Sequence, residues 1–181
     1  MIEEEILLNS HIVYKHEEII DAVNKIANKL NKKFSGEKVL LLPVLTGAIP
    51  FVGFLIPKLT FMMEVSYIHV SRYQNNVGQK NISFIYEPNE DVIKDQNVLV
   101  VDDILDEGIT MKYIYERLNL LNPKSLNNVV LFNKKLETPK AIESNFHGLD
   151  IDDEYVFGFG LDCDGLGRNF PDLYALKMQP K

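Results

Sequence analysis

The residues from 98 to 111 constrain this chain most, because a buried strand there runs directly into a cluster of acids. The apolar run 98–101 is typical of a strand buried in a parallel sheet, and the periodic segment from 110 to about 121 predicts a helix. Between the two we expect a turn. The polar residues of this segment are Asp102, Asp103, Asp106, Glu107, Gly108 and Thr110.

A strand–turn–helix junction of this kind is suited to binding a phosphate. Its backbone N–H groups point toward one place, and the positive end of the helix dipole adds to their attraction. The acids would repel a phosphate unless hydroxyl groups or a cation lay between them. A ribose that carries a 5′-phosphate, a pyrophosphate and Mg²⁺ meets both conditions. The alternative is that the acids only cap the helix and fill the loop.

The rest of the chain alternates between strand and helix patterns. Such alternation predicts βαβ units and a mostly parallel sheet, whose ligands bind beyond the carboxyl ends of the strands. A polar segment from 71 to 97 shows little periodicity, and its first part, 71–80, is expected to be a long loop. The predicted helices are 17–30 and 49–58, and the other predicted strands are 39–45, 61–70, 127–132 and 155–159. The loops expected to converge at one edge of the sheet contain Thr46, Ser71, Asp102 and Lys134.

The composition is that of an ordinary globular protein and argues against several other classes. A formal net charge of −7 disfavours a protein whose main partner is nucleic acid or an anionic membrane. The single cysteine, Cys163, cannot form an internal disulfide. The acidic residues 1–5 are unlike a secretory signal, and no apolar run approaches the roughly 18–20 residues of a membrane span. We therefore expect a cytoplasmic protein.

Two motifs resemble those of the type I phosphoribosyltransferases, and within them the hypoxanthine-guanine branch. The first is the acidic strand–turn–helix segment described above. The second begins with Tyr155 and Val156, continues through a Gly-rich stretch and ends at Asp162. Arg168, six residues further on, matches an arginine of the family.

The resemblance also implies the fold. We expect an α/β fold with a mostly parallel core sheet, flanking helices and a small C-terminal hood. A chain of 181 residues is long enough for one domain with a sizeable core. The expected single phosphoribosyltransferase domain, residues 1–181, has its core at about 12–134 and its hood at about 135–181.

The resemblance assigns one set of residues to the phosphoribosyl substrate. Asp102 and Asp103 would hold the ribose hydroxyls, and Asp106 would take a proton from the base as the catalytic residue. Family members bind pyrophosphate with the loop that here holds Thr46, often through a strained peptide bond. Many relatives carry a charged residue at Thr46 and a polar one at Ile109, so both positions depart from the pattern. The expected phosphoribosyl pyrophosphate ligands are Asp102, Asp103, Asp106, Glu107, Gly108, Ile109, Thr110, Thr46, Gly47 and Arg168.

A second set is implied to bind the purine and the metal. Lys134, with Lys135 as the alternative, would donate to the 6-oxo group of the base, which adenine lacks. Tyr155 would stack on the base, and Val156 would offer backbone groups to its edge. Asp162 lies beside the purine site and would bind Mg²⁺. The expected metal ligands are Asp162, Asp102 and Asp103.

The polar segment after the third predicted strand resembles the mobile lid of the family. Its residues Ser71, Arg72 and Tyr73 would close over the reaction and keep water from a ribosyl cation. Simpler interpretations stay open for several of these features. The lid can be an ordinary surface loop, Thr46 and Gly47 can be a plain strand-ending turn, and Tyr155 can serve only in strand packing.

Together these features imply purine salvage. The enzyme would transfer the 5-phosphoribosyl group from phosphoribosyl pyrophosphate to hypoxanthine, guanine or both, giving IMP or GMP and pyrophosphate. The alternatives are a phosphoribosyltransferase for another base such as xanthine, and a non-catalytic regulator on the same fold that senses a nucleotide. We expect Mg²⁺ as cofactor, a purine and phosphoribosyl pyrophosphate as small-molecule partners, no nucleic acid or membrane partner, and a homodimer or homotetramer.

Overall fold

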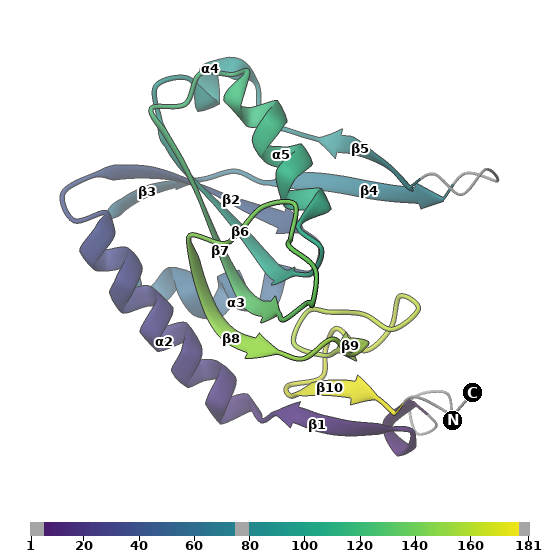
Figure 1. Cartoon of the computed structure of the whole chain (residues 1–181). Helices are drawn as coiled ribbons and strands as arrows, with labels where there is room; N and C mark the ends of the chain where they lie inside the picture. Colours follow the sequence, from purple (N-terminus) through teal and green to yellow (C-terminus); the bar gives the residue numbers. More distant parts are fainter. Residues whose placement is uncertain (1–5, 75–79, 178–181) are drawn as a thin grey trace.

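The molecule is built around a large, mostly parallel sheet (Figure 1). The computed structural model describes residues 6–74 and 80–177. The strands of this sheet are β2 (Lys38–Leu45), β3 (Met62–Val65), β4 (Ile68–Gln74), β5 (Lys80–Tyr86), β6 (Asn97–Leu105), β7 (Ser125–Lys134) and β8 (Phe146–Ile151). Their order is β5-β4-β2-β6-β7-β8, and β3 also pairs with β2.

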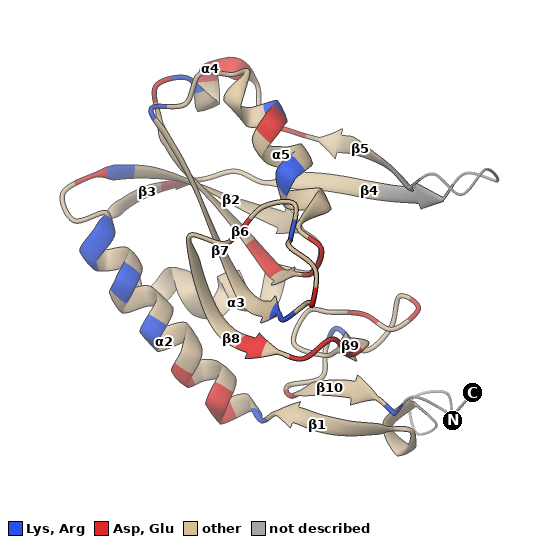
Figure 2. Cartoon of the chain, viewed as in Figure 1, with Lys and Arg blue, Asp and Glu red and all other residues tan. Residues whose placement is uncertain are grey.

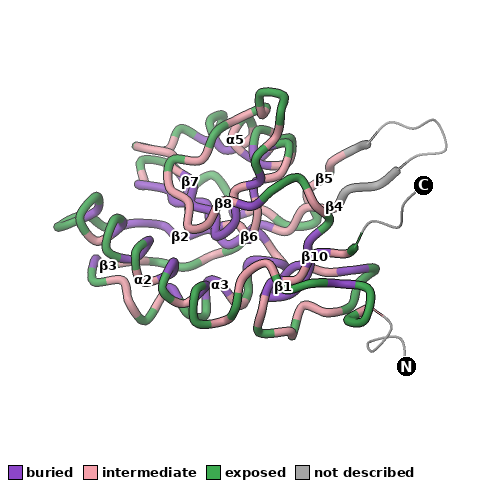
Figure 3. The backbone as a smooth tube through the Cα atoms, turned by 60° about the horizontal axis from the view of Figure 1, so that its bottom comes forward, coloured by how far each residue is buried: buried purple, intermediate pink, exposed green. Residues whose placement is uncertain are grey.

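All neighbouring strands of this sheet are parallel except β4 and β5. At its centre Leu41 of β2 lies opposite Leu99 of β6, and Leu99 lies opposite Asn127 of β7. These strands are almost entirely buried (Figure 3). Their near-continuous apolar sequences are those of parallel strands that are covered on both faces. The expected α/β fold with a mostly parallel core sheet is confirmed.

Helices cover both faces of the sheet. On one face lie α2 (His16–Lys33), α3 (Ile49–Leu55) and a 3₁₀ turn, η1 (Ile56–Lys58), and on the other lie α4 (Glu90–Ile93) and α5 (Ile109–Asn119). No helix in the described part of the chain is long and apolar enough to cross a membrane.

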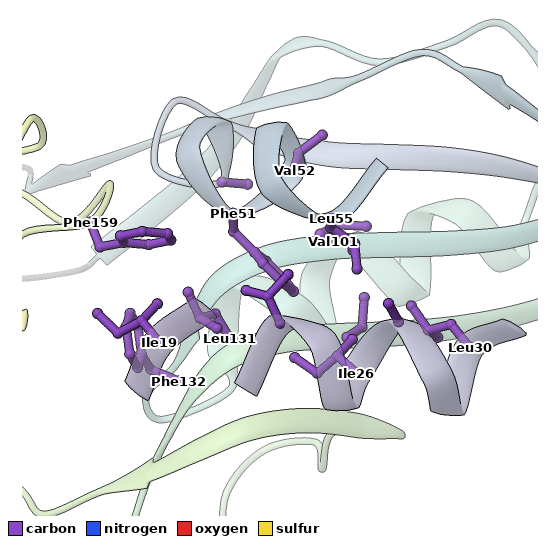
Figure 4. Close-up of a cluster of buried hydrophobic side chains, with 14 of the residues drawn as sticks. Ile19, Ile26, Leu30, Phe51, Val52, Leu55, Val101, Leu131, Phe132 and Phe159 are labelled. Atoms are coloured by element: carbon purple, nitrogen blue, oxygen red, sulfur yellow. The ribbon is translucent and has the colours of Figure 1, made fainter. Parts of the chain in front are cut away.

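Alternate residues of the central strands serve the two helical layers. Leu41 and Leu99 belong to the hydrophobic cluster of α2 and α3, whereas their neighbours Leu40 and Val98 belong to the cluster of α5. Figure 4 shows part of the first cluster, in which Val101 of β6 lies among side chains of α2 and α3. The side chains of a strand point alternately to its two faces, so two separate cores form. The helix α2 meets its core with one apolar stripe, which comprises Ile19, Ala22, Val23, Ile26, Ala27 and Leu30.

A second, antiparallel sheet forms the hood beside the large one. Its strands are β1 (Ser10–Tyr14), β10 (Leu173–Leu176) and β9 (Val156–Phe157), in that order. The expected boundary near residue 134 therefore needs correction, because β8 belongs to the large sheet and the N-terminal strand β1 belongs to the hood. The carboxylate of Asp172 accepts the backbone N–H of His16 at 2.7 Å, which joins the hood to the first turn of α2.

The structure differs from the sequence predictions most in the outer strands. The predicted strand 61–70 is two strands, β3 and β4. The polar segment predicted as a long loop forms a β-hairpin, because β4 continues to Gln74 and pairs with β5. Edge strands of a sheet alternate polar and apolar residues, so they lack the continuous apolar run that marks a buried strand. Residues 75–79, which follow β4 and precede β5 in the sequence, lie outside the described residues.

Candidate active site

The acidic residues predicted to form a turn lie partly within β6. Asp102 is still paired with Val130 of β7, and the ladder continues until Leu105 lies opposite Asn133. The prediction that the strand ends at Val101 is therefore wrong. The reason is that β7 continues alongside and supplies hydrogen-bond partners for a longer β6. The carboxyl end of β6 thus carries its acids on a rigid strand.

Asp103 is a buried carboxylate at this end of β6. Its Oδ1 accepts the N–H of Ile104 at 2.7 Å, and its own N–H donates to Oδ1 of Asp102 at 2.9 Å. Burial raises the pKa of Asp103, while its bond with Asp102, the Ile104 amide and the charge of Arg168 act in the opposite direction. The fold therefore holds a carboxyl group here whose charged form is costly to bury, which is typical of a functional site.

The turn between β6 and α5 spans residues 106–108. Gly108 is the N-cap of α5 and has a φ of 76°, a conformation that favours glycine. A Cβ added there would lie 2.9 Å from the carbonyl oxygen of Ile142, so a side chain has no space. The carbonyl of Glu107 accepts the N–H of Ala141 at 2.9 Å. These contacts fix the turn and direct the N-terminus of α5 toward the end of β6.

The loop after β2 packs against Asp103. The peptide bond between Leu45 and Thr46 is cis. A Cβ added at Gly47 would overlap the carboxylate of Asp103, with its Cγ at 2.7 Å, and would lie 3.4 Å from Nη1 of Arg168. A Cβ added at Gly160 would in turn overlap the carbonyl oxygen of Gly47. Two glycines thus let three segments approach each other, one from β2, one from β6 and one from the hood.

The hood contributes an acid and a base that are paired with each other. Nη2 of Arg168 lies 2.5 Å from Oδ1 of Asp162, and Nη1 of Arg168 donates to the carbonyl oxygen of Gly160 at 2.5 Å. The second oxygen of Asp162 accepts the N–H of Gly165 at 2.9 Å. Both side chains are thereby oriented beside the glycine that touches the β2 loop.

These elements enclose a cavity of about 350 Å³, a size suited to a small ligand. Figure 2 shows acidic segments at the carboxyl end of β6 and around β9, with a basic one at the end of β7. The expectation that the loops after the strands converge is met by the segments of Thr46 and Asp102. The residues that line the cavity are Val44, Leu45, Thr46, Gly47, Val70, Asp102, Asp103, Ile104, Leu105, Asp106, Gly108, Thr110, Met111, Leu161, Asp162 and Arg168.

Lys134 ends β7 next to this cavity. Its side chain is only 10% exposed, and its Nζ lies 3.3 Å from Oδ1 of Asp106 and 3.5 Å from Oδ1 of Asp153. The neighbouring Lys135 has a 64% exposed side chain that pairs with Asp150 at 3.6 Å. Successive residues of a strand point to opposite faces, so only one of the two lysines can face Asp106. The structure places Lys134 there.

Tyr155 lies on the hood side of the same region. It is 53% exposed, and its hydroxyl donates to the carbonyl oxygen of Asp162 at 3.5 Å. Partial burial raises the pKa of Tyr155, and the nearby Cys163, Asp162 and Asp164 add to this effect. Val156 is buried in β9, where it lies opposite Ala175. About half of the Tyr155 residue is thus accessible to a ligand.

Some predicted residues lie away from the cavity wall. Ser71 follows the lining residue Val70 in β4, and the side chains of Arg72 and Tyr73 lie outside the described part of the chain. Glu107 and Ile109 are adjacent in sequence to lining residues but do not line the cavity themselves, and Lys134, Tyr155 and Val156 are not lining residues either.

Sequence reasoning missed two charged residues near Lys134. One is Asp153, which lies 3.5 Å from the Lys134 ammonium group. The other is Lys140, whose ammonium group donates to the carbonyl oxygen of Leu105 at 2.9 Å. Both occur in polar loop segments, where charged residues are normally solvated, so no pattern in the sequence distinguishes them.

The comparison with known proteins fits this geometry. A family model described as the phosphoribosyl transferase domain matches residues 9–164. The chain belongs to the phosphoribosyltransferase family. The resemblance inferred from the two sequence motifs is therefore confirmed, and the end of β6 with the N-terminus of α5 carries the first of these motifs in the phosphoribosyltransferase fold.

Individual relatives point to one branch of this family. The hypoxanthine-guanine phosphoribosyltransferase of Mycoplasma genitalium is 33% identical over 162 residues, which are 88% of this chain and 91% of that protein. A crystal structure of a hypoxanthine phosphoribosyltransferase from Staphylococcus aureus, 28% identical, superimposes with a TM-score of 0.84 over 92% of this chain and 91% of the other. The hypoxanthine phosphoribosyltransferase of Trypanosoma cruzi, solved with the product IMP, is 26% identical and gives 0.80 over 91% and 92% of the two chains.

Proposed function

We propose that this chain is a purine-salvage enzyme of the hypoxanthine-guanine branch. It transfers the 5-phosphoribosyl group of phosphoribosyl pyrophosphate to hypoxanthine, guanine or both, and forms IMP or GMP and pyrophosphate. One observation carries the proposal: the acidic end of β6, the N-terminus of α5 and the hood pair of Asp162 and Arg168 line a single cavity. The names of the relatives agree with this activity, and neither alternative, a xanthine enzyme or a regulator, has support.

The phosphoribosyl half of the reaction uses the β6–α5 junction. The backbone N–H groups at the start of α5, from Gly108 to Thr110, bind the 5′-phosphate together with the helix dipole. Asp102 and Asp103 accept hydrogen bonds from the ribose hydroxyls. The loop at Gly47 supplies backbone N–H groups to the pyrophosphate, and so neither Thr46 nor Ile109 needs a polar side chain of the family type.

Arg168 binds the leaving pyrophosphate. Its guanidinium group can meet two phosphate oxygens at once, and it already lies near Gly47 at the cavity wall. Negative charge builds up on the pyrophosphate as the bond to the ribose breaks. A fixed cation at that place stabilises the transition state more than the ground state.

Mg²⁺ fits this set of residues as a cofactor shared with the substrate. The described residues contain no group of three acidic, histidine or cysteine side chains that could hold a metal ion by themselves. Mg²⁺ is usually held by one or two carboxylates together with substrate phosphates and water. Asp162 on the hood side and Asp102 and Asp103 on the β6 side would hold it, and when bound it neutralises charge on the pyrophosphate. Replacing Asp162 by Ala should raise the Mg²⁺ concentration needed for half-maximal activity, while the protein stays folded.

The purine half uses the residues around Lys134. Its ammonium group donates a hydrogen bond to the 6-oxo group of the base, and Tyr155 stacks on the ring. Val156 contributes backbone groups to the edge of the base. Asp106, 3.3 Å from Lys134, takes the proton from the imidazole ring as the bond to the ribose forms.

The direct test is a set of reactions with defined substrates. The protein is incubated with Mg²⁺, phosphoribosyl pyrophosphate and one base at a time, namely adenine, hypoxanthine, guanine or xanthine, and the nucleotide is identified by mass spectrometry. We expect IMP or GMP, and formation of neither would refute the proposal. Asp106→Asn should lower kcat by about 10²- to 10⁴-fold with little change in the affinity for phosphoribosyl pyrophosphate.

We also propose three properties that support this activity. The hairpin of β4 and β5, with Ser71, Arg72 and Tyr73, acts as the lid, since Val70 of β4 lines the cavity. The protein forms a homodimer or homotetramer, because exposed apolar side chains lie along the outer strands at Met62, Val65 and Ile85. Its location is the cytoplasm. Light scattering measures the oligomeric state, and protection of the hairpin from proteolysis by substrate tests the lid.

A further inference from the structure

The side chain of Lys140 joins the ends of two strands of the large sheet. Its Nζ donates to the carbonyl oxygen of Leu105, the last residue of β6, at 2.9 Å. The same Nζ donates to Oδ1 of Asn133, the penultimate residue of β7, at 2.5 Å. Lys140 itself lies in the segment between β7 and β8, outside any strand or helix.

The two groups held by Lys140 precede the proposed catalytic pair. Leu105 is followed by Asp106, and Asn133 is followed by Lys134. Leu105 and Asn133 are also the last residues that β6 and β7 place opposite each other in the described ladder. Beyond this pair of residues the two strands are no longer paired, so the ladder does not fix their spacing there. The ammonium group of Lys140 is bonded to both residues of this last pair.

The environment of Lys140 indicates that its ammonium group is held between the two strand ends rather than solvated. Partial burial lowers its pKa and the charge of Lys134 adds to this, while the carboxylates of Glu143, Asp106 and Asp150 act in the opposite direction. Lysines are almost never fully buried without a partner. Here the partners are a backbone carbonyl and an amide oxygen, which are fixed parts of the two strands.

Asn133 is oriented for this bond by a third strand. Its Nδ2 donates to Oδ1 of Asp150 in β8 at 2.8 Å, so its Oδ1 is left to face Lys140. The same hydrogen bond is the main cause of the lowered pKa of Asp150. A continuous set of hydrogen bonds therefore runs from β6 through Lys140 and Asn133 to β8.

We propose that Lys140 is a positioning residue for phosphoribosyl transfer, which sets the spacing between Asp106 and Lys134. This inference rests on the proposed function. The base must reach the Asp106 carboxylate and the Lys134 ammonium group at the same time, and these two groups lie 3.3 Å apart. Misplacing reacting groups by about 1 Å can lower a rate by about 10²-fold. Lys140 contacts the strand ends and does not line the cavity, so it acts through Asp106 and Lys134.

The test compares three variants of the full chain. Lys140→Met keeps the length of the side chain but removes its donors, whereas Lys140→Arg keeps the charge and the donors. The control is Lys124→Met, which removes an exposed, ion-paired lysine just before β7, at the opposite end of that strand. For each protein the measurements are kcat, KM for both substrates, the pH dependence of kcat, and Tm.

We expect Lys140→Met to lower kcat with hypoxanthine by about 10²-fold and to move the pH dependence of kcat, since Asp106 would no longer be held beside Lys134. KM for phosphoribosyl pyrophosphate should change less than kcat, because Lys140 has no hydrogen bond to Asp102, Asp103 or Arg168, which are proposed to bind it. Lys140→Arg should recover most of kcat, and Lys124→Met should resemble the wild type in kcat and pH dependence.

An active wild type together with a Lys140→Met variant of unchanged kcat and pH dependence would overturn the positioning role alone. A wild type that forms no nucleotide would overturn the proposed function, and this inference with it. If Lys140→Met does not fold, a comparison of kcat between Lys140→Arg and Lys140→Gln tests the positioning role instead. An active Arg variant with a folded, slow Gln variant supports the role, and equal kcat values for the two variants contradict it.

Discussion

The contact between Gly47 and Asp103 allows a sharp prediction from one added methyl group. In Gly47→Ala the new Cβ would overlap the Asp103 carboxylate and lie 2.7 Å from its Cγ, whereas real Cβ atoms essentially never approach other atoms within 3.0 Å. Asp103 cannot simply move aside, because it is buried and its Oδ1 is bonded to the N–H of Ile104 at 2.7 Å. We expect the overpacking to cost about 1–3 kcal/mol of the free energy of unfolding. For a chain of this size that corresponds to a Tm lower by roughly 2–12 °C.

The same displacement should impair catalysis. Moving Asp103 and the loop at Gly47 misplaces the proposed ribose and pyrophosphate ligands, so kcat/KM for phosphoribosyl pyrophosphate should fall by about 10²-fold. The matched control is Gly53→Ala in α3, where an added Cβ meets nothing within 4 Å. It should stabilise the protein by about 0.5–1 kcal/mol without changing kinetics. A Gly47→Ala enzyme with the Tm and kcat/KM of the wild type would refute the close approach of these segments.

Two further predictions concern charged groups of the site. Lys134→Ala should lower kcat/KM for hypoxanthine by about 1.5–3 kcal/mol, or roughly 10- to 150-fold, and Lys135→Ala should not; the reverse result would move the purine contact to Lys135. Burial raises the pKa of Asp103, so the folded protein binds more protons than the unfolded chain as pH rises above about 4, and this residue then destabilises the fold. Asp103→Asn should therefore unfold at higher denaturant concentration than the wild type at pH 7, with the difference shrinking as pH falls toward the ordinary aspartate pKa of about 4. A difference that grows on acidification would contradict this sign.

The buried parallel strands could be predicted because their sequences carry the signal. The residues 98–101 must be apolar on both faces, since helices cover both sides of the sheet, and Gly108 marks the only kind of residue that its turn accommodates. The acids at the end of β6 could be predicted to belong to a site, because they follow directly on an apolar run, where burial normally excludes charge.

The outer strands and the hood could not be predicted from the sequence in the same way. β1 and β10 belong to one sheet although about 160 residues separate them. No local sequence pattern indicates a pairing between segments so far apart in the chain. The hairpin of β4 and β5 has one exposed face, so its polar residues resemble those of a loop. The contact of Arg168 with Asp162 depends on the path of the hood, which places two residues of one loop against the β2 segment.

The charges of the cavity explain why its parts must act together. Among the described residues that line it, Asp102, Asp103, Asp106 and Asp162 are acidic, and Arg168 is the one basic residue. Arg168 is already bonded to Asp162, so the wall by itself repels a free anion. We expect a substrate with a phosphate and a pyrophosphate to bind together with a cation that offsets these carboxylates, while its hydroxyls would donate hydrogen bonds to the acids of β6. On the proposed function we therefore expect the acidic wall to favour a metal-bound sugar phosphate over simple phosphates, since specificity can arise from what a site repels as well as from what it binds.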